Sequence, residues 1–338
     1  MIGVAIIGYG YWGPNLARNF ARLPGVQIAA IADPDPARRL AASHDHPSAR
    51  VEADAASAIA APAVDAVVIA APPSEHRALA IAALERGRHV LLEKPPATDL
   101  PAARDMVAVA ARRGCIFMVD HTFVFAPAVN ALAAMVRGGE VGELAFIEST
   151  RTNLARFDPA IGVIRDLAVH DLAILDHMLA RQPVRIAARG RRSAGGGPEE
   201  VALIALDYDN GLLVHLHVNC ISPVKIRRMA IGGTRGLAIY DDIEQTEKVR
   251  LYLHDRDADK ETRGGTALRI GYRTGTVTSP AVAPTEPLAR VVEHFVDCVR
   301  SGAQPLTGGT FALRVLAAAE AAERSLAAGG IPCTPEAP

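Results

Sequence analysis

The chain has 338 residues, of which 50% are hydrophobic and 22% charged, as expected for a globular protein with room for two domains. A net charge of -1 excludes the strongly basic surface that nucleic acids and anionic membranes attract, so we expect neither as a partner. The four cysteines form no C-x-x-C pair, which argues against structural zinc and favours a reducing compartment. Since no signal peptide or membrane-length apolar run is recognised, we expect a cytoplasmic protein.

Strands and helices are expected to alternate over residues 1–120. Apolar runs predict strands at 4–7, 26–32, 49–51, 66–71, 89–93 and 115–119. The segments between them predict helices at 14–23, 36–42, 54–60, 75–86 and 100–112. Because uniformly apolar strands separated by helices form a parallel sheet covered on both faces, this part is predicted to be a doubly wound α/β domain of the Rossmann type.

Residues 121–338 follow a different order and are predicted to form a second, α+β domain. Helices are expected at 129–137, 166–179, 287–300 and 310–328, with an early strand at 145–152. Six further strands follow one another without helices, at 183–190, 201–208, 212–219, 226–233, 237–241 and 249–254. Asp209-Asn210-Gly211 between two alternating runs predicts a hairpin, so we expect an open, mostly antiparallel sheet. The polar, glycine-rich segment 256–283 predicts a long loop.

The segment 8-GYGYWG-13 matches the pattern G-x-G-x-x-G, follows a predicted strand and opens a predicted helix. The glycines permit a tight turn and close approach of a pyrophosphate, to which the helix N-terminus offers free N–H groups. The residues predicted to contact a dinucleotide here are Gly8, Gly10, Tyr11, Trp12 and Gly13.

Asp33 ends the second predicted strand, twenty residues after Gly13. A carboxylate at this place binds both hydroxyls of an adenosine ribose and repels the extra phosphate of NADP, so the sequence favours NAD over NADP. Arg38 is a further predicted cofactor contact, and together with Arg39 it could soften this preference by reaching a phosphate. The alternative for Asp33 is a loop carboxylate that caps the following helix.

The strand 66–71 is expected beside the first strand, at the point where cofactor and substrate meet. Ala71 and Pro72 at its end are predicted cofactor contacts. His76 either lines the cofactor groove or lies on the surface of the next helix.

The stretch 89-HVLLEKPPATDL-100 places a charged pair and two prolines directly after an apolar strand. Charges at such a place are costly unless they are solvated, paired or in use. Lys94 is predicted at the carboxyl edge of the sheet, beside the nicotinamide, where an ammonium group can bind a substrate hydroxyl and stabilise a developing oxyanion. The alternative is a surface lysine in a turn.

The segment 165-RDLAVHDLAILDHM-178 places Asp166 and His170 four residues apart, on one face of a predicted helix. The carboxylate can orient the imidazole and raise its basicity for acid–base catalysis, and with Lys94 the two could converge on one alcohol carbon. One alternative is a helix N-cap at Asp166 with a solvated His170. A metal set completed by His177 lacks a recognised ligand signature, and we expect no metal.

The sequence resembles the glucose-fructose oxidoreductase, inositol dehydrogenase and rhizopine-catabolism (Gfo/Idh/MocA) family over nearly its whole length. The resemblance rests on 8-GYGYWG-13 with Asp33, on 93-EKP-95, and on D-x-x-x-H-D from Asp166 to Asp171. It implies a Rossmann domain and a C-terminal domain with an open, mostly antiparallel sheet, whose free face builds a homodimer or homotetramer. It also implies an NAD(P)-dependent enzyme that oxidises or reduces a CH–OH carbon of a sugar or inositol ring.

The resemblance further implies roles for individual residues. Lys94 would hold the reacting hydroxyl, and His170 would act as the acid or base with Asp166 beside it. Glu93 would lie near the nicotinamide ribose. Candidate substrate contacts around the predicted pocket are His121, Arg151, Asn153 and Arg165 together with Asp166 and His170.

Segments 10–20, 222–233 and 286–295 are similar to the branch associated with nucleotide-sugar pathways, which includes UDP-N-acetylglucosamine 3-dehydrogenases and keto-sugar reductases. A nucleotide-linked sugar is therefore the expected substrate. Arg165 stands where that branch often has an aromatic residue, and its cation could touch an anionic substrate group or point to solvent.

Two other functions remain open on the sequence. An NAD-dependent glycosidase would oxidise a ring hydroxyl transiently and form no net NADH. A non-catalytic, NAD-binding regulatory protein would bind the nicotinamide cofactor without turnover.

Overall fold

The structure, a computed structural model, describes residues 1–154, 161–192, 197–254 and 274–337. The chain forms two compact units. The first contains Met1–Ala126 and Thr285–Ala317, and the second contains Pro127–Pro284 and Ala318–Glu336. The sequence-based division at residue 120 assigned the whole C-terminal part to one domain, whereas the chain returns to the first unit near its end. The reason is that the helix α9 (Pro287–Ser301) packs against α1 (Gly13–Ala21).

The first unit is built on a six-stranded sheet in which every pair of neighbours is parallel. Its order is β3-β2-β1-β4-β5-β6. The strands are β1 (Ile2–Ile7), β2 (Val26–Ala32), β3 (Arg50–Glu52), β4 (Ala66–Ile69), β5 (His89–Glu93) and β6 (Phe117–Asp120). This is the predicted Rossmann arrangement. The chain winds outward on both sides of β1 and β4, so the carboxyl ends of these two strands open onto the switch point of the sheet.

The first unit also contains helices, and the starts of several of them follow from the sequence. The helices are α1, α2 (Pro36–Asp45), α3 (Ala55–Ile59), α4 (Pro73–Glu85), α5 (Leu100–Arg113), α9 and the first part of α10 (Gly309–Ala327). The carboxylates of Asp35, Asp54 and Asp99 each accept a hydrogen bond from a backbone N–H of the first helical turn. The central strands are buried on both faces, as their uniformly apolar sequences require.

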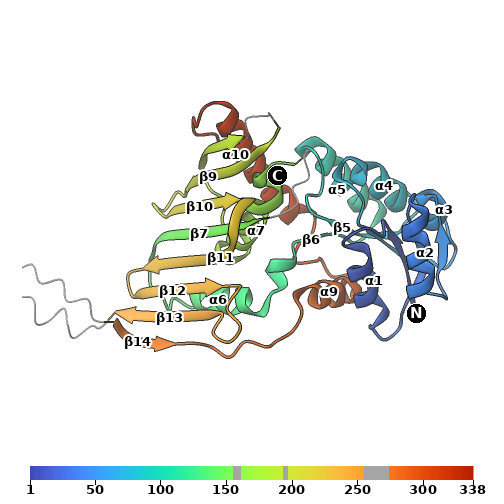
Figure 1. Ribbon diagram of the computed structural model, residues 1–338, viewed down its shortest axis with the longest axis horizontal. Helices are drawn as coiled ribbons and strands as arrows, with labels where there is room; N and C mark the ends of the chain where they lie inside the picture. The colour runs from blue at the N-terminus through green and yellow to red at the C-terminus, as the bar shows by residue number, and fades with distance from the viewer. Residues whose placement is uncertain (155–160, 193–196, 255–273, 338) are drawn as a thin grey trace, which may run out of the picture. The chain divides into compact units, whose positions relative to one another are not determined.

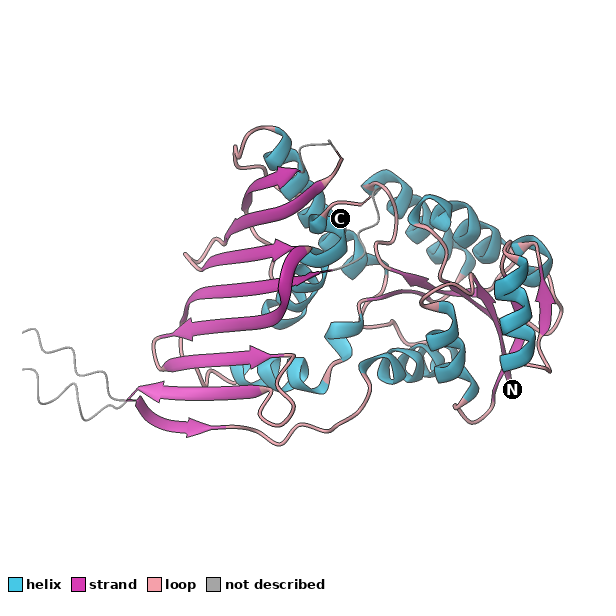
Figure 2. Cartoon of the chain, viewed as in Figure 1, coloured by secondary structure: helices cyan, strands magenta, loops and turns pink. Residues whose placement is uncertain are grey.

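The second unit is built on an eight-stranded sheet of order β14-β13-β12-β11-β7-β10-β9-β8, in which the strands from β14 to β9 are labelled in Figure 1 and drawn in magenta in Figure 2. Its strands are β7 (Leu144–Leu154), β8 (Arg185–Arg192), β9 (Glu199–Asp207), β10 (Leu213–Asn219), β11 (Ile221–Gly233), β12 (Gly236–Asp241), β13 (Val249–His254) and β14 (Thr274–Thr278). Among the described strands of this sheet, only β7 and β10 pair in parallel, so the predicted mostly antiparallel sheet is confirmed. The helices of this unit include α6 (Pro127–Arg137) and α7 (Val169–Leu179).

The two faces of this sheet differ. In β10, Val214, Leu216 and Val218 are buried, whereas Leu213 and His215, which alternate with them, are exposed. The period of two means that one face is covered and the other is open. Helix α6 contacts β12, and a short π-helical turn at Ile164–Ala168 contacts β10.

The structure differs from the sequence-based expectations at two places. Strand β14 lies inside the predicted loop 256–283, which was wrong for residues 274–278, while residues 256–273 of that loop lie outside the described residues. Short threonine-rich segments such as Thr274–Thr278 gain their strand structure from pairing with a neighbour, here β13, rather than from an apolar run. The predicted helix 166–179 begins with a π-helical turn before α7.

Candidate functional site

The glycine-rich loop has the shape that a dinucleotide requires. Gly8 has a φ of +93°, and a Cβ atom on it would lie 2.5 Å from the carbonyl oxygen of Ala70. A Cβ atom on Gly13 would lie 2.1 Å from the oxygen of Gly8. Both positions therefore exclude a side chain. Gly8 is required by the turn itself, and Gly13 by the close packing of α1 on the end of β1.

Gly10, the second glycine of the motif, serves a different purpose. A Cβ atom on Gly10 would meet only the flexible guanidinium of Arg38, at 3.4 Å, so the fold itself does not require glycine there. Helix α1 starts at Gly13, and no side chain caps its first turn, so the N–H groups of that turn are available to an anion. The side chains of Tyr11 and Trp12 are exposed on the loop. These features fit a pyrophosphate.

Asp33 ties the end of β2 to this loop. Its Oδ2 atom accepts a hydrogen bond from the N–H of Tyr9 at 2.7 Å, and its Oδ1 atom accepts one from the N–H of Asp35 at 2.9 Å. The side chain is buried, and Arg38 Nη1 lies 3.6 Å from Asp33 Oδ2. Asp35, not Asp33, caps the following helix, so the alternative of a helix-capping Asp33 does not hold.

His76 is fully buried beneath the ends of β4 and β5. Its Nε2 atom lies 2.8 Å from the carbonyl oxygen of Ala71, and its Nδ1 atom lies 3.0 Å from that of Pro95. The imidazole thus joins the loop that begins at Ala71 and Pro72 to the turn that follows Lys94. Burial lowers the pKa of His76, against the opposing effect of the carbonyl oxygens. Of the two sequence-based alternatives, a surface position does not hold.

Glu93, the last residue of β5, and Asp120, the last of β6, are paired neighbours in the sheet, and both are buried. Lys94 follows Glu93 directly and is half-buried, so it lies at the carboxyl edge of the sheet as predicted. His121 follows Asp120, is fully buried and packs on the ring of Phe311 with ring centres 5.4 Å apart. Glu93, Lys94 and His121 were predicted as site residues from the sequence, but Asp120 was not. The predicted strand ended at residue 119, and the carboxylate that follows it was given no role.

The acid–base candidates of the second unit lie at a helix irregularity. Asp166 is in the π-helical turn Ile164–Ala168, and His170 is in the first turn of α7. Both side chains are half-buried. Single π-helical turns inside helices occur often at functional sites.

A residue that the sequence-based search missed holds α7 in place. Asp171 is buried and accepts hydrogen bonds from Arg151 of β7, with Nη2 to Oδ1 at 2.7 Å and Nε to Oδ1 at 3.1 Å. Arg151, a predicted substrate contact, is therefore a buried partner of the residue next to His170. Nothing in the sequence spacing links residues 151 and 171, and only the D-x-x-x-H-D pattern marked Asp171.

The other candidates of the second unit have distinct surroundings. Arg165 makes two hydrogen bonds of 2.7 Å to the carboxylate of Glu323 and lies 3.6 Å from that of Glu320, both on α10. It therefore does not simply point to solvent. Asn153 is half-buried on β7. His177 Nε2 lies 3.1 Å from Asn130 Oδ1. Among the residues that the structure describes, no group of three metal-ligating side chains is close enough to hold an ion.

The fold and the glycine-rich loop define a dinucleotide-binding protein with a second, sheet-based unit. Two family models match the chain, "Oxidoreductase family, NAD-binding Rossmann fold" over residues 2–121 and "GFO/IDH/MocA C-terminal domain" over residues 129–239. The chain therefore belongs to the Gfo/Idh/MocA oxidoreductase family. This confirms the predicted family, the fold, the oxidoreductase class and NAD as the cofactor.

Individual relatives have related names. The chain is 30% identical to D-apiose dehydrogenase of Paraburkholderia graminis over 94% of this chain and 85% of the relative. It is 31% identical to inositol 2-dehydrogenase of Corynebacterium glutamicum over 64% of this chain and 66% of that enzyme. Among solved structures, UDP-N-acetylglucosamine 3-dehydrogenase of Acidithiobacillus ferrooxidans superimposes with a TM-score of 0.82 at 25% identity, covering 97% of this chain and 99% of the other.

Proposed function

We propose that the protein transfers a hydride between NAD and a CH–OH carbon of a sugar. The observation that carries the proposal is the placement of Lys94 directly after β5, at the carboxyl edge of a sheet whose switch point also carries the glycine-rich loop and Asp33. NAD supplies the hydride acceptor when it is bound. Lys94 donates a hydrogen bond to the reacting hydroxyl and stabilises the negative charge that develops on its oxygen.

His170 is proposed as the general base, with Asp166 as the carboxylate that orients its imidazole. The hydroxyl proton leaves to the imidazole while the hydrogen on the carbon leaves as hydride, so that a C=O bond forms. In the reverse direction the imidazolium returns the proton. The proposal thus has Lys94 and the Asp166–His170 pair act on one carbon.

We further propose a nucleotide-linked sugar as the substrate. Support comes from the match to the UDP-N-acetylglucosamine 3-dehydrogenase over nearly the full length of both chains. D-apiose dehydrogenase, whose name refers to a free sugar, is the competing model. The predicted substrate contacts are His121, Arg151, Asn153 and Arg165. Because Arg151 and Arg165 are held in ion pairs with carboxylates of this chain, a role in positioning is simpler for these two than direct contact with the substrate.

The test is an assay of the full chain with NAD and a panel of UDP-sugars, free pentoses and hexoses, and inositols, followed by NADH absorbance. A compound that is oxidised by the wild type should lose about 100-fold or more in kcat/KM with Lys94→Ala. Lys225→Ala, which removes an exposed lysine of β11, is the matched control and should leave the rate unchanged.

Cofactor binding is measured separately, so that a lost step and a lost cofactor are distinguished. Trp12, the only tryptophan of the chain, lies on the glycine-rich loop and is partly exposed, so its fluorescence reports NAD binding. NAD binding with no turnover of any compound would favour the regulatory protein. Cleavage of a glycoside without net NADH would favour the glycosidase.

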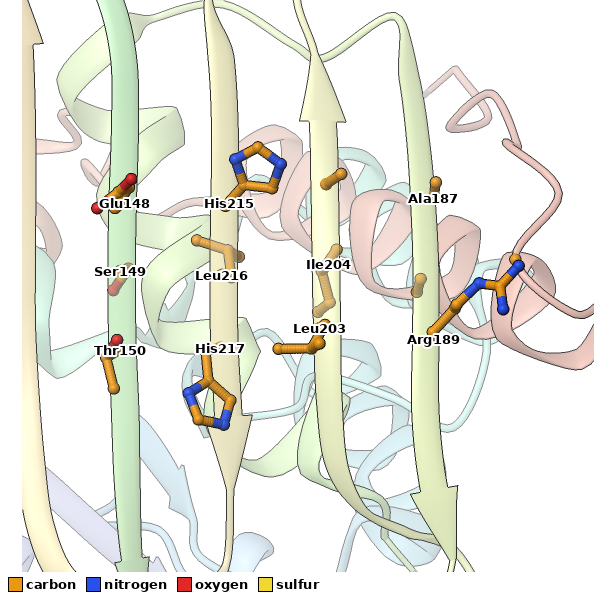
Figure 3. A pocket seen from close by; sticks show the side chains of 13 residues that line it. Glu148, Ser149, Thr150, Ala187, Arg189, Leu203, Ile204, His215, Leu216 and His217 are labelled. Carbon is orange, nitrogen blue, oxygen red and sulfur yellow. The ribbon is translucent and has the colours of Figure 1, made fainter.

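The open face of the eight-stranded sheet is proposed as the interface of a homodimer or homotetramer. Leu203 of β9 and Leu213 of β10 lie on this face and are 58% and 51% exposed, and large apolar side chains exposed on one face indicate an interaction surface. A groove of about 450 Å³ runs across β7, β10, β9 and β8, with His215 and His217 on one strand of it (Figure 3). No helix of the described residues is long and apolar enough to cross a membrane. The cytoplasmic location remains a prediction.

A further inference from the structure

Two buried carboxyl groups lie side by side next to Lys94. Glu93 and Asp120 are register partners at the carboxyl ends of the adjacent parallel strands β5 and β6, and their side chains make contact. Their residues are 8% and 2% exposed. Asp120 Oδ1 accepts a hydrogen bond from the hydroxyl of Thr122 at 2.7 Å. Among the described residues, Glu93 Oε1 and Asp120 Oδ2 have no hydrogen-bond partner.

It would be energetically unfavourable for both carboxyl groups to be ionised at this buried position. Both groups are pure acceptors when ionised, so neither satisfies the other, and two like charges repel strongly where water is excluded. One proton held between them turns one group into a donor and leaves a single negative charge. Burial, and then the neighbouring Asp120, raises the pKa of Glu93 well above its usual value, and burial raises the pKa of Asp120 to about 6.

The positive charge that faces this pair is Lys94. Its ammonium group acts to lower the pKa of both carboxyls, but the effect of burial is larger and the net change is a rise. His121 is neutral, since burial and then the Lys94 charge lower its pKa to about 3. Its two ring nitrogens have no hydrogen-bond partner among the residues that the structure describes. It therefore adds no charge that would balance a second carboxylate.

Two other elements approach the same place. From α4, the buried His76 reaches the backbone oxygen of Pro95, and burial lowers its pKa, so that it too is neutral. From α10, Arg314 lies over the ring of Phe311, with 5.7 Å between its guanidinium carbon and the ring centre. Neither residue contributes to the raised pKa of the two carboxyls.

We propose that Glu93 and Asp120 hold one proton between them and act as a positioning pair, supplying the single buried negative charge that balances the Lys94 ammonium. The pair does not touch the reacting carbon. It fixes the charge and place of the Lys94 ammonium group, which is proposed to bind the reacting hydroxyl. The inference deepens the proposed function, on which its catalytic meaning rests, but the shared proton is tested without turnover.

Amide substitutions test the charge count. In Asp120→Asn the amide can accept from Thr122 and donate to Glu93, so the remaining carboxylate keeps the net charge of the proposed pair. Glu93→Gln does the same for Asp120. The double variant Glu93→Gln/Asp120→Asn removes the charge altogether while it preserves size and polarity. Single variants should therefore leave the ionisation of Lys94 unchanged, and the double variant should alter it.

The pKa of Lys94 is measured by competitive labelling of amines over a pH series, with peptide mass spectrometry as the readout. The chain has only four lysines, Lys94, Lys225, Lys248 and Lys260, so the labelled peptides are easily separated. We expect each single variant to have the wild-type value and the double variant to be lower by about 1–3 pH units, the usual effect of losing a nearby opposite charge. Asp297→Asn, at an exposed carboxylate of α9, is the control and should have no effect.

Two other results would overturn the proposal. A lower Lys94 pKa in each single variant would mean that both carboxyls are ionised in the wild type. No change even in the double variant would mean that the pair carries no charge. Neither result depends on whether a substrate has been found, so a failure of this inference is distinguishable from a failure of the proposed function.

The pH dependence of unfolding gives a second readout, which keeps the single variants informative if the double variant does not fold. A carboxyl with a raised folded-state pKa binds more proton in the folded state, so its stabilising effect is lost as pH rises from about 4 through the folded pKa. Wild-type protein should release about one more proton on unfolding in that range than either single variant. Equal proton release in all three proteins would contradict a shared proton.

Discussion

At the scale of single residues, Asp171 shows how a buried side chain can set the position of a neighbour, His170, that is proposed to act on the substrate. It is the residue after His170, and it is directed into the unit toward Arg151 of β7. A buried, two-point ion pair of this kind fixes the start of α7 against the sheet. The direction in which His170 leaves the helix follows from that attachment.

Removal of one partner of the Arg151–Asp171 ion pair should lower the free energy of unfolding much more than removal of both. Asp171→Asn leaves the Arg151 guanidinium buried without its ion-pair partner, and we expect a loss of about 3–5 kcal/mol in the free energy of unfolding. The pair Arg151→Met/Asp171→Leu should lose less than the single variant, because no buried charge remains. Urea unfolding followed by circular dichroism measures both. A single variant as stable as the wild type would show that the ion pair does not fix α7.

At the scale of elements, the glycine-rich loop separates what folding requires from what the cofactor requires. Gly8 is needed for its positive φ and for the closeness of Ala70, whereas Gly10 has room for a methyl group in the protein itself. A motif found in the sequence does not distinguish these two reasons. Only the neighbours of each glycine do, and they come from β4 and α2, which are far away in the chain.

Alanine at these two positions should therefore give different results. Gly8→Ala is expected to lower the free energy of unfolding by about 1–3 kcal/mol, because a non-glycine residue is strained there and meets a backbone oxygen. Gly10→Ala should keep wild-type stability but weaken NAD binding at least tenfold, because the methyl group occupies space needed by the pyrophosphate. Thermal unfolding and Trp12 fluorescence titration measure the two effects. Equal stability losses would contradict this division.

Elements that sequence patterns predicted well are those with a strong local signal. The parallel strands are apolar throughout, and the helices of the first unit begin at Asp or Pro residues, so both were located to within a few residues. The π-helical turn at Ile164–Ala168 and strand β14 have no such signal. The first depends on contacts with β10, and the second on its partner β13.

At the scale of the whole molecule, buried histidines give the stability a defined dependence on pH. The folded-state pKa of His121 is lowered to about 3 and that of His76 is also lowered, both mainly by burial. The unfolded chain binds these protons near pH 6.5 and the folded chain does not. Their contribution is therefore fully present above pH 6.5 and is lost as the pH falls toward the folded-state pKa.

His121→Phe should reduce this acid sensitivity, since phenylalanine keeps an aromatic ring against Phe311 and binds no proton. Between about pH 4 and 6, the slope of the free energy of unfolding against pH should be smaller in the variant than in the wild type, by up to about 1.4 kcal/mol per pH unit. His254→Gln, at an exposed histidine of β13, is the control and should leave the slope unchanged. Urea unfolding at several pH values measures it. Identical slopes in wild type and His121→Phe would show that His121 is not held neutral.

The proposed subunit interface also belongs to this scale. Leu203→Glu or Leu213→Lys places a charge on the open face of the sheet, and we expect each to convert the oligomer into monomers. Leu40→Glu, at an exposed leucine of α2 in the first unit, should leave the oligomer intact. Light scattering after size-exclusion chromatography measures the mass. A wild-type protein that is already monomeric would overturn the proposal.

For the molecule as a whole, the sequence predicted the class of each sheet. In the first unit it also located the glycine-rich loop, Asp33 and Lys94 at strand ends, because each follows directly after an apolar strand. It was less informative in the second unit. Arg151 and Arg165 were identified as cations near the expected substrate, yet their carboxylate partners lie 20 and 158 residues away in the chain. Charge pairing over such distances is a property of the folded chain and has no local pattern.

Asp33 has a consequence for any attempt to re-engineer the cofactor preference. The carboxylate proposed to select NAD also accepts the N–H of Tyr9, so the residue that discriminates between cofactors is at the same time a structural support of the loop that holds them. Exchanging it for glycine or alanine would remove both functions together. A successful switch to NADP therefore needs a neutral acceptor such as serine or asparagine at this position, with Arg38 left free to meet the extra phosphate. Variation at position 33 is constrained by architecture as well as by chemistry.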